Sequence, residues 1–179
     1  CARALPSFLL AGGRVETGTP VVLAPMAGVT NAAFRTLCRE QGAGLYLCEM
    51  ITSRGLVCGD RRTDAMLTFF DEERIRSVQT YGTNPPVVAR AVELLCTRHG
   101  AAHVDLNLGC PVPKVTRKGG GGVLPWKIGL VREIITAAVR AGDRHGVPVT
   151  VKTRIGIDEG HTMWRDVADI AQEAGAAAI

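Results

Sequence analysis

The sequence predicts an α/β fold with a parallel sheet, namely a (β/α)8 TIM barrel truncated to about its first five to six βα units. Apolar segments of strand length alternate along the chain with segments of helical period, an order that allows a doubly wound open sheet or a barrel. Polar residues at the carboxyl ends of several expected strands favour the barrel, because barrel active sites are built there. The chain has 179 residues, fewer than the roughly 250 of a complete barrel.

The first βα unit is expected over residues 21–42. Residues 21–27 form a short apolar run, as in a parallel strand that is buried on both faces. Thr30 has the side chain of a helix N-cap, and Gly42 stands where a helix commonly ends. The apolar residues between them recur at helical spacing and predict the buried side of the helix: Ala33, Phe34, Leu37 and Cys38.

The next two strands are expected at residues 45–50 and 76–81, whereas residues 51–70 show no regular pattern. The second of these strands leads to a helix that Asn84 caps and Pro85 begins. Proline is well tolerated at this position, because N–H groups in the first helical turn have no acceptor within the helix and the missing N–H costs nothing. The expected buried stripe of this helix is Val88, Ala91, Val92, Leu95 and Cys96.

The fourth strand is expected over residues 103–108, which alternate polar and apolar side chains. Because successive side chains of a strand point to opposite faces, His103, Asp105 and Asn107 share one side. A polar face on a central strand suggests that this side lines a site.

The rest of the chain continues the alternation. A helix is expected over residues 127–140, a fifth strand over 147–155 and a further helix over 164–174. Residues 176–179 match the start of a sixth strand. Because the chain also begins with Cys1 rather than Met, we expect it to be a fragment.

Composition and charge narrow the class of protein. The chain is 46% hydrophobic and 21% charged, as in soluble globular proteins, and no apolar run is long enough to cross a membrane. None of the six cysteines belongs to a Cys-x-x-Cys pair, so we expect no metal site. The net charge of +4 is compatible with RNA as a partner but does not require it. Cysteine usage and the lack of a secretory signal predict a cytoplasmic protein.

Cys110 stands in the segment Asn-Leu-Gly-Cys-Pro, just past the fourth strand. A loop that places a cysteine between glycine and proline presents the thiol rather than burying it. A thiol at the functional end of a barrel strand is a candidate acid or nucleophile. On these grounds alone, a structural cysteine stays equally open.

Three further strand ends could bind a ligand. Residues 25–27 (Pro-Met-Ala) leave the first strand in a turn that a flat ligand could approach, although a plain tight turn would look the same. Gln79 could pair with the amide edge of a heterocycle. Lys152 and Arg154 share a face of the fifth strand, where two cations are costly unless they meet an anion or an electron-rich ligand.

Lys114, Arg117 and Lys118 form the densest cationic cluster, beside the glycine run 119–122, which we expect to be mobile. Cations in such a loop can meet backbone phosphates, although a solvated charged segment has the same composition. The chain has neither a P-loop nor a Rossmann glycine motif.

Together and in this order, these segments resemble bacterial tRNA-dihydrouridine synthases. The matching stretches are Leu-Ala-Pro-Met-Ala-Gly-Val-Thr-Asn, Val-Gln-Thr-Tyr-Gly, Asn-Leu-Gly-Cys-Pro-Val-Pro-Lys-Val-Thr-Arg-Lys-Gly-Gly-Gly and Val-Thr-Val-Lys-Thr-Arg. The resemblance implies that residues 1–19 are an N-terminal extension. It implies that residues 20–179 are the N-terminal portion of an FMN-binding TIM-barrel catalytic domain, without its remaining strands and a C-terminal helical domain.

The resemblance also implies the chemistry. In that family NADPH reduces FMN, the reduced flavin passes a hydride to C6 of a uracil ring in tRNA, and a cysteine, here Cys110, gives a proton to C5. The residues expected to bind FMN are Pro25, Met26, Ala27, Gln79 and Lys152. The residues expected at the tRNA substrate are Asn107, Arg154, Lys114, Arg117 and Lys118.

Two alternatives stay open. Another FMN barrel that reduces free pyrimidines, similar to dihydroorotate dehydrogenase, would explain Lys152 and a strand-end asparagine, but not the basic run after Cys110. An inactive fragment that binds RNA or partner chains would fit an incomplete barrel with unpaired strand edges. If the chain is part of a tRNA-dihydrouridine synthase, we expect the 179 residues to be inactive by themselves.

Overall fold

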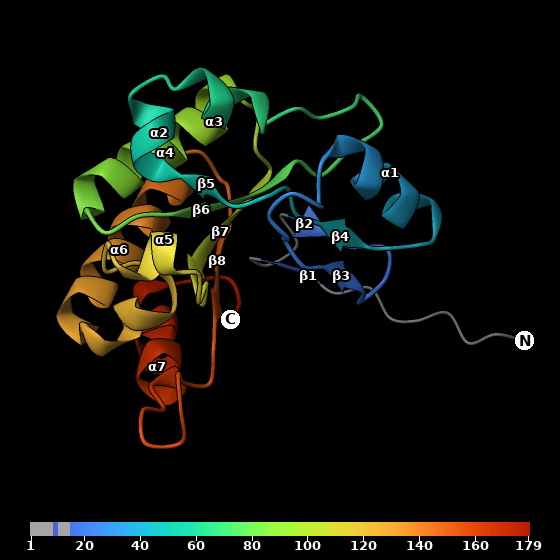
Figure 1. The fold of residues 1–179 in the computed structure, drawn as a ribbon. Helices are drawn as coiled ribbons and strands as arrows, with labels where there is room; N and C mark the ends of the chain where they lie inside the picture. The colour runs from blue at the N-terminus through green and yellow to red at the C-terminus, as the bar shows by residue number, and fades with distance from the viewer. Residues whose placement is uncertain (1–8, 11–14) are drawn as a thin grey trace, which may run out of the picture.

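The structure is a computed structural model that describes residues 9–10 and 15–179. It is a mixed α/β fold (Figure 1), and part of the expected N-terminal extension lies outside the described residues. In chain order the elements are β1 (Leu9–Leu10), β2 (Val15–Glu16), β3 (Val22–Leu23), α1 (Ala32–Glu40), β4 (Leu45–Tyr46), β5 (Ile51–Thr52), α2 (Ser53–Val57), α3 (Arg61–Ala65), β6 (Ser77–Tyr81), α4 (Pro85–Arg98), β7 (His103–Leu108), α5 (Pro113–Thr116), the 3-10 helix η2 (Gly121–Trp126), α6 (Ile128–Asp143), β8 (Val149–Thr153) and α7 (Trp164–Ala174).

The parallel strands lie side by side in the order in which they occur along the chain. β3 pairs with β4, and β5, β6, β7 and β8 form a second parallel sheet. A bridge between Leu47 and Ser77 continues the strand of β4 onto β6 and so joins the two sheets at their edges. A bridge between Thr150 and Ala178 places the last residues beside β8, where the sequence predicts a sixth strand.

Three strands are shorter than predicted, among them the strand expected over 147–155, which is confined to β8. The strand expected over 21–27 is reduced to β3, because the Met26 carbonyl oxygen accepts hydrogen bonds from the N–H groups of Val29 and Thr30 at 3.1 and 3.0 Å and the chain turns there. The strand expected over 45–50 is reduced to β4, which pairs with β3, and to the single bridge of Leu47 with Ser77 at the start of β6. β5, which pairs with the end of β6, begins only after residue 50, in the stretch where no regular element was expected.

Alternation along the central strands separates an apolar face from a polar face. The apolar face packs against α4, α6 and α7, which form one layer of neighbouring helices (Figure 1). Its strand residues are Val78, Val104, Leu106, Val149 and Val151. On the opposite face, the pairing register places the polar side chains in adjacent rows: Ser77, Gln79, His103, Asp105, Asn107, Thr150 and Lys152.

The helices that cover the central strands confirm the predictions. The side chain of Asn84 accepts a hydrogen bond from the Val87 N–H at 3.1 Å and caps α4, which begins at Pro85. α7 has the predicted bounds, and Gly175 ends it with a φ of 84°, which suits glycine. The stretch 51–70 is less irregular than expected, because it contains the short helices α2 and α3.

The cap of the first helix was wrongly predicted. Asn31, not Thr30, is the N-cap of α1, and its side chain accepts a hydrogen bond from the Phe34 N–H at 3.0 Å. Thr30 is buried, and its hydroxyl oxygen accepts a hydrogen bond from the Met26 N–H at 3.0 Å. The threonine therefore stabilises the turn before the helix rather than the helix itself.

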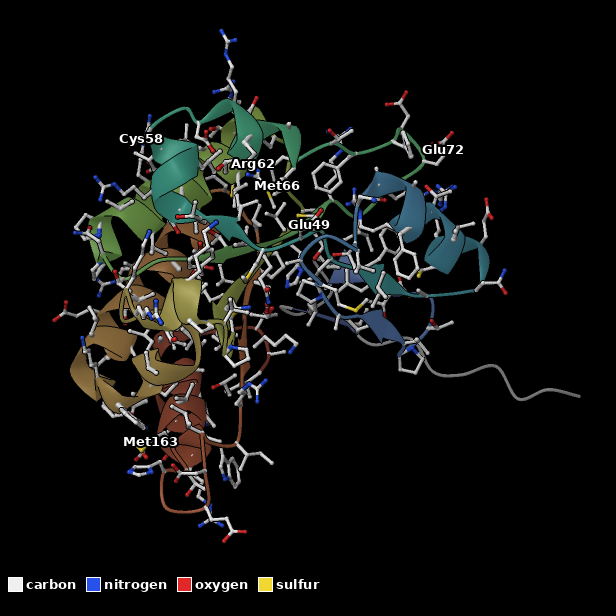
Figure 2. All side chains as sticks on the ribbon, viewed as in Figure 1. Glu49, Cys58, Arg62, Met66, Glu72 and Met163 are labelled. Atoms are coloured by element: carbon white, nitrogen blue, oxygen red, sulfur yellow. The ribbon has the colours of Figure 1, made fainter. Side chains whose placement is uncertain are left out.

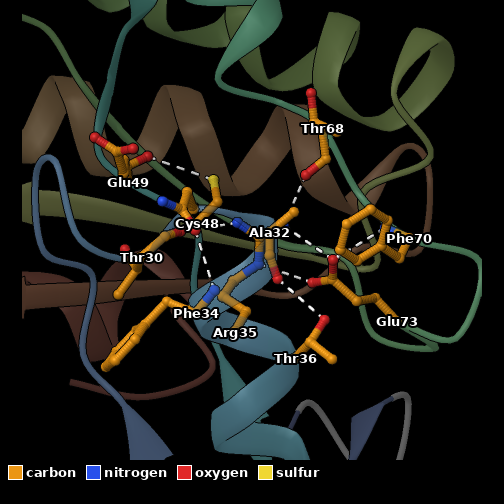
Figure 3. Close-up of polar contacts among 11 residues, drawn as sticks. Thr30, Ala32, Phe34, Arg35, Thr36, Cys48, Glu49, Thr68, Phe70 and Glu73 are labelled. Carbon is orange, nitrogen blue, oxygen red and sulfur yellow. Dashed lines mark hydrogen bonds and ion pairs between the residues drawn. The ribbon is translucent and has the colours of Figure 1, made fainter.

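The buried side of α1 is also different from the predicted one, because an ion pair anchors the helix (Figure 3). Leu37 was expected to be buried but is 58% exposed, whereas Arg35 is 0% exposed. The Arg35 guanidinium donates to both carboxylate oxygens of Glu73, at 2.8 and 3.0 Å, and to the carbonyl oxygens of Thr30 and Thr68, at 2.8 and 2.7 Å. A buried guanidinium is tolerated when its donors have such partners.

The described part of the N-terminal extension packs on the amino ends of the strands. β1 and β2 form an antiparallel pair. Leu10 and Val15 pack with Leu45 and Leu47 in a small second cluster that Ala177 also touches. This cluster lies at the amino ends of β4 and β6, opposite the carboxyl ends where a site is expected.

Candidate active site

Cys110 lies at the carboxyl end of β7 and is half-buried. The side-chain oxygen of Asn107 accepts hydrogen bonds from the N–H groups of Gly109 and Cys110 at 3.1 and 2.9 Å. An asparagine that bonds its own backbone two and three residues on fixes a tight turn. The last polar residue of the strand therefore positions the cysteine that follows it.

The glycine run after Cys110 is packed against it, which corrects our expectation of a mobile segment. Gly121 and Gly122 are buried, and the Gly122 N–H donates to the Cys110 carbonyl oxygen at 2.9 Å. Gly121 has a φ of 60°, and a Cβ atom on it would lie 2.3 Å from that same oxygen. Only glycine fits there, so this part of η2 supports the Cys110 backbone.

The predicted cations of the loop lie on α5 and directly after it. Lys114 is on this short helix, Arg117 caps its end and Lys118 follows. All three side chains are exposed. They are free to meet a polyanion, and they lie within eight residues of Cys110 along the chain.

The two cations that were expected to share one face of the fifth strand occupy different positions, because β8 ends at Thr153. Lys152 is exposed and pairs in register with Asn107 of β7, so the two side chains share the polar face. Arg154 lies just past the strand, and its Nε donates to the carbonyl oxygen of Gly109 at 2.7 Å. The guanidinium thus contacts the turn that carries Cys110.

Gln79 lies deeper than the other predicted residues, being 1% exposed. Its Nε2 donates to a carboxylate oxygen of Asp105 at 2.6 Å, and its Oε1 accepts from the Asn107 side-chain amide at 2.8 Å. One N–H and one lone pair of the amide remain for a ligand. Asp105 was not among the predicted site residues, although its place between His103 and Asn107 on one strand face could have indicated it.

The turn after β3 is built to hold an exposed apolar surface. Met26 is 39% exposed, and the Thr30 hydroxyl fixes the backbone of this turn as described above. Gly28 has a φ of 76°, and its N–H donates to a Glu49 carboxylate oxygen at 2.6 Å. Pro25, Met26 and Ala27 therefore lie at the same edge as Cys110, three strands away along the joined sheets.

An open hollow of about 450 Å³ lies beside this turn, between α1 and α3. Figure 2 labels Glu49, Arg62 and Met66 of its lining. None of the predicted site residues lines it. A smaller recess includes Arg154, beside the Cys110 turn, and is lined further by Gly122, Pro125, Trp126, Gly156, Ile157, His161 and Met163.

Two other kinds of feature are missing from the described part of the chain. Over residues 9–10 and 15–179, no three histidine, cysteine or acidic side chains gather so that they could hold a metal ion. Among the helices of that same part of the chain, none is both long and apolar enough to span a membrane.

Comparison with known proteins decides the family. Residues 22–179 match the family model described as dihydrouridine synthase (Dus). The chain belongs to the dihydrouridine synthase family. The match covers every strand-end residue predicted above, from Pro25 to Arg154.

Individual relatives of the chain agree with this family. A probable tRNA-dihydrouridine synthase of Mycobacterium tuberculosis is 49% identical over 181 residues, which cover 97% of this chain and 46% of the relative. tRNA-dihydrouridine synthase B of Pseudomonas aeruginosa is 42% identical, over 89% of this chain and 47% of the relative. The Escherichia coli protein of the same name is 37% identical, over 93% and 51%. The chain spans about half the length of these curated relatives.

Proposed function

We propose that the chain is the N-terminal portion of the catalytic domain of a tRNA-dihydrouridine synthase, and that this domain is a (β/α)8 barrel. Parallel strands in chain order, with α4, α6 and α7 in one layer, support the barrel, because a doubly wound sheet reverses its strand order and covers both faces. In this arrangement residues 20–179 supply the first five to six βα units after the extension 1–19. The polar face of the sheet becomes the barrel interior.

The proposed reaction reduces the C5=C6 double bond of a uridine in tRNA, with NADPH as the source of electrons. When bound, FMN in its reduced form supplies the hydride that is added to C6. Cys110 supplies the proton to C5, so the hydride and this proton together convert the double bond to a single bond. A positioned acid is needed because addition at C6 builds negative charge toward C5 and O4. Cysteine is among the side chains that can give a proton in this way.

The strand-end residues present fit a flavin. The exposed apolar turn of Pro25, Met26 and Ala27 suits the face of a flat ring. The free N–H of Gln79 and the ammonium group of Lys152 suit its polar edge. Asn107 and Arg154 would face the uracil or the flavin, and Arg154 already contacts the Cys110 turn.

The same proposal assigns Lys114, Arg117 and Lys118 to tRNA phosphates. A uridine must leave its stack to reach a barrel interior, at a cost of a few kcal/mol, and contacts with phosphates offset such a cost. The five described cysteines are free thiols, which suits a reducing compartment such as the cytoplasm.

The observation that carries the proposal is the half-buried Cys110 on a turn that Asn107 closes and Gly121 supports, in a chain of this family. The rival function, reduction of free pyrimidines, does not use the exposed cations after Cys110. The substrate that is reduced distinguishes the two functions. Purified full-length protein carrying this sequence should bind FMN and, with NADPH, form dihydrouridine in unmodified tRNA, while free uracil, uridine and orotate stay unreduced. Turnover of a free pyrimidine without turnover of tRNA would overturn the proposal.

A further inference from the structure

The polar side chains on the face of the sheet opposite the helices form one continuous series of hydrogen bonds. The series crosses β6, β7 and β8 and ends on the backbone of Cys110. Its links are Ser77 Oγ to His103 Nδ1 at 2.6 Å, His103 Nε2 to Thr150 Oγ1 at 2.9 Å, Thr150 Oγ1 to Asp105 Oδ1 at 2.5 Å, Gln79 Nε2 to Asp105 Oδ2 at 2.6 Å, Asn107 Nδ2 to Gln79 Oε1 at 2.8 Å and Cys110 N to Asn107 Oδ1 at 2.9 Å.

The Asp105 carboxylate sets the direction of one arm of this series. Both of its oxygens accept hydrogen bonds, and an ionised carboxylate can do nothing else. The Thr150 hydroxyl donates its only hydrogen to Asp105, so its oxygen must accept a hydrogen bond from His103 Nε2–H. A neutral imidazole has a single N–H, and His103 Nδ1 therefore accepts from the Ser77 hydroxyl. Burial lowers the pKa of His103 to about 4, which keeps the ring neutral as this arrangement requires.

The same carboxylate sets the direction of the other arm. Because Asp105 accepts from Gln79 Nε2, the Oε1 atom of Gln79 must face Asn107. Oε1 accepts from Asn107 Nδ2, so the oxygen of Asn107 points toward the backbone N–H groups of Gly109 and Cys110. If Gln79 were reversed, Asn107 would reverse too, and its Nδ2 donors would face those two N–H donors.

The burial of the Asp105 carboxylate costs free energy, which indicates that the residue has a specific function in the fold. It is 4% exposed, and burial raises its pKa, opposed by the hydrogen bonds from Thr150 and Gln79 and by the positive charge of Lys152. Burying a carboxylate costs free energy unless its partners compensate. Its partners here are groups whose orientation decides how Cys110 is held.

We propose that Asp105 is a positioning residue that fixes the amide orientations of Gln79 and Asn107 and thereby the placement of Cys110. It acts through these two side chains and touches no reacting atom. The inference deepens the proposed function, since it rests on Cys110 being the proton donor. Its structural part, the control of the Cys110 turn, holds whatever the substrate is.

The test replaces Asp105 by asparagine in the full-length protein carrying this sequence. Asparagine has nearly the same shape, but it must place a donor where one carboxylate oxygen accepted. The substitution is made together with Thr150→Val and compared with Thr150→Val alone, because valine cannot accept a hydrogen bond from the new donor. The donor must then face Gln79, so Gln79 and Asn107 are driven to reverse. The matched control is Asp166→Asn, because Asp166 is an exposed residue of α7. Circular dichroism and flavin content establish that each variant is folded and loaded.

Two readouts follow, one of them independent of catalysis. The first is the rate at which iodoacetamide alkylates Cys110, measured by peptide mass spectrometry. It should rise severalfold in Asp105→Asn with Thr150→Val, compared with Thr150→Val alone, because the turn loses its two backbone hydrogen bonds, and should not change in Asp166→Asn. The second separates the half-reactions. Oxidation of the reduced flavin by tRNA should slow by about 10- to 100-fold, while reduction by NADPH stays within about twofold.

A second variant covers the case in which Asp105→Asn fails to fold. It combines Asp105→Asn with Gln79→Glu, so that the new carboxylate at position 79 accepts from the introduced amide at position 105 and from Asn107. The orientation of Asn107 is thereby restored, and alkylation of Cys110 should return toward the wild-type rate.

An unchanged alkylation rate in Asp105→Asn with Thr150→Val, or equal slowing of both half-reactions, would overturn the inference. A changed alkylation rate in a protein that reduces no tRNA uridine would support the placement of Cys110 and refute the proposed function alone.

Discussion

The cysteine side chains differ in how far they are buried and in where they lie relative to the strand ends. Cys48 is 0% exposed, and burial raises the pKa of its thiol to about 12. Burial likewise raises the pKa of Cys96 to about 11. Cys58 is exposed at the end of α2, away from the strand ends. Only Cys110, among the thiols in the described ranges, combines partial exposure with a place at the carboxyl end of a strand.

His103 leads to a prediction about stability and pH. Its pKa is lowered from 6.5 to about 4 by burial. Between these values the unfolded chain binds more protons than the folded one, so His103 contributes stability that is complete above about pH 6.5 and is lost as the pH falls toward 4. The shift corresponds to about 3 kcal/mol. Relative to His103→Gln, the full-length protein should therefore gain free energy of unfolding as the pH rises through this window.

Urea unfolding at several pH values measures this difference. His145→Gln is the matched control, because His145 is exposed, and its unfolding free energy should follow that of the wild type. If the curves of the wild type and His103→Gln ran parallel, His103 would not be buried in its neutral form.

Single residues were predictable where a local rule decides them. Asn84 and Gly175 match their predicted roles because capping depends on neighbours in the chain. The burial of Arg35 was not predictable, since its partner Glu73 is 38 residues away. Asp105 was placed on the correct face by strand alternation, but its contacts with Gln79 and Thr150 come from two other strands.

At the scale of elements, the loop after β7 and the helix η2 act as one unit. A Cβ atom at Gly121 would meet the Cys110 carbonyl oxygen at 2.3 Å, so Gly121→Ala must displace the Cys110 backbone. We expect this variant of the full-length protein to lose most tRNA reduction while it keeps its flavin. Nucleoside mass spectrometry of tRNA and the flavin absorbance measure the two properties.

The control for this substitution is Gly129→Ala in α6, where a Cβ atom meets nothing within 4 Å. Alanine there should leave dihydrouridine formation unchanged and slightly favour the helix. If both alanine variants were fully active, η2 would not support Cys110 in the way described.

The exposed cations on and after α5 should carry part of the affinity for tRNA. Replacing Lys114, Arg117 and Lys118 together by alanine should weaken binding. It should also reduce the slope of log affinity against log salt by about one for each phosphate that the protein no longer neutralises. Filter binding or fluorescence titration over a range of salt concentrations measures both quantities.

The matched control removes three exposed cations from α4 and α6, namely Arg90, Arg132 and Arg140. These helices cover the apolar face, away from the strand ends, so the salt slope should barely change. An equal loss of affinity in both triple variants would indicate a response to net charge alone.

Long elements with a strong period were predicted well, and short ones were not. β7, α4 and α7 match closely because apolar packing and local caps agree. α2, α5 and η2 were missed because each has six residues or fewer, too few for a helical period to appear. β3 and β4 were expected to be longer, because a turn at Met26 ends the first and a change of pairing partner from β3 to β6 ends the second, and composition indicates neither.

For the whole molecule, the sequence predicts alternating strands and helices, and the structure places the parallel strands in chain order. Barrel closure could not be derived in the same way, because it depends on pairing between the first strand and strands beyond those described. The strand ends that the order brings to one edge include most of the predicted site. Residues 25–27 lie three strands from β7, and closure of a barrel is what would bring them across from Cys110.

The most direct test of the central claim is the dihydrouridine content of tRNA treated with Cys110→Ala in the full-length protein. With FMN bound and NADPH supplied, nucleoside mass spectrometry should find dihydrouridine absent with this variant and normal with Cys58→Ala, whose thiol is also accessible. Normal dihydrouridine formation by a Cys110→Ala protein that retains its flavin would contradict the assignment of Cys110 as the proton donor.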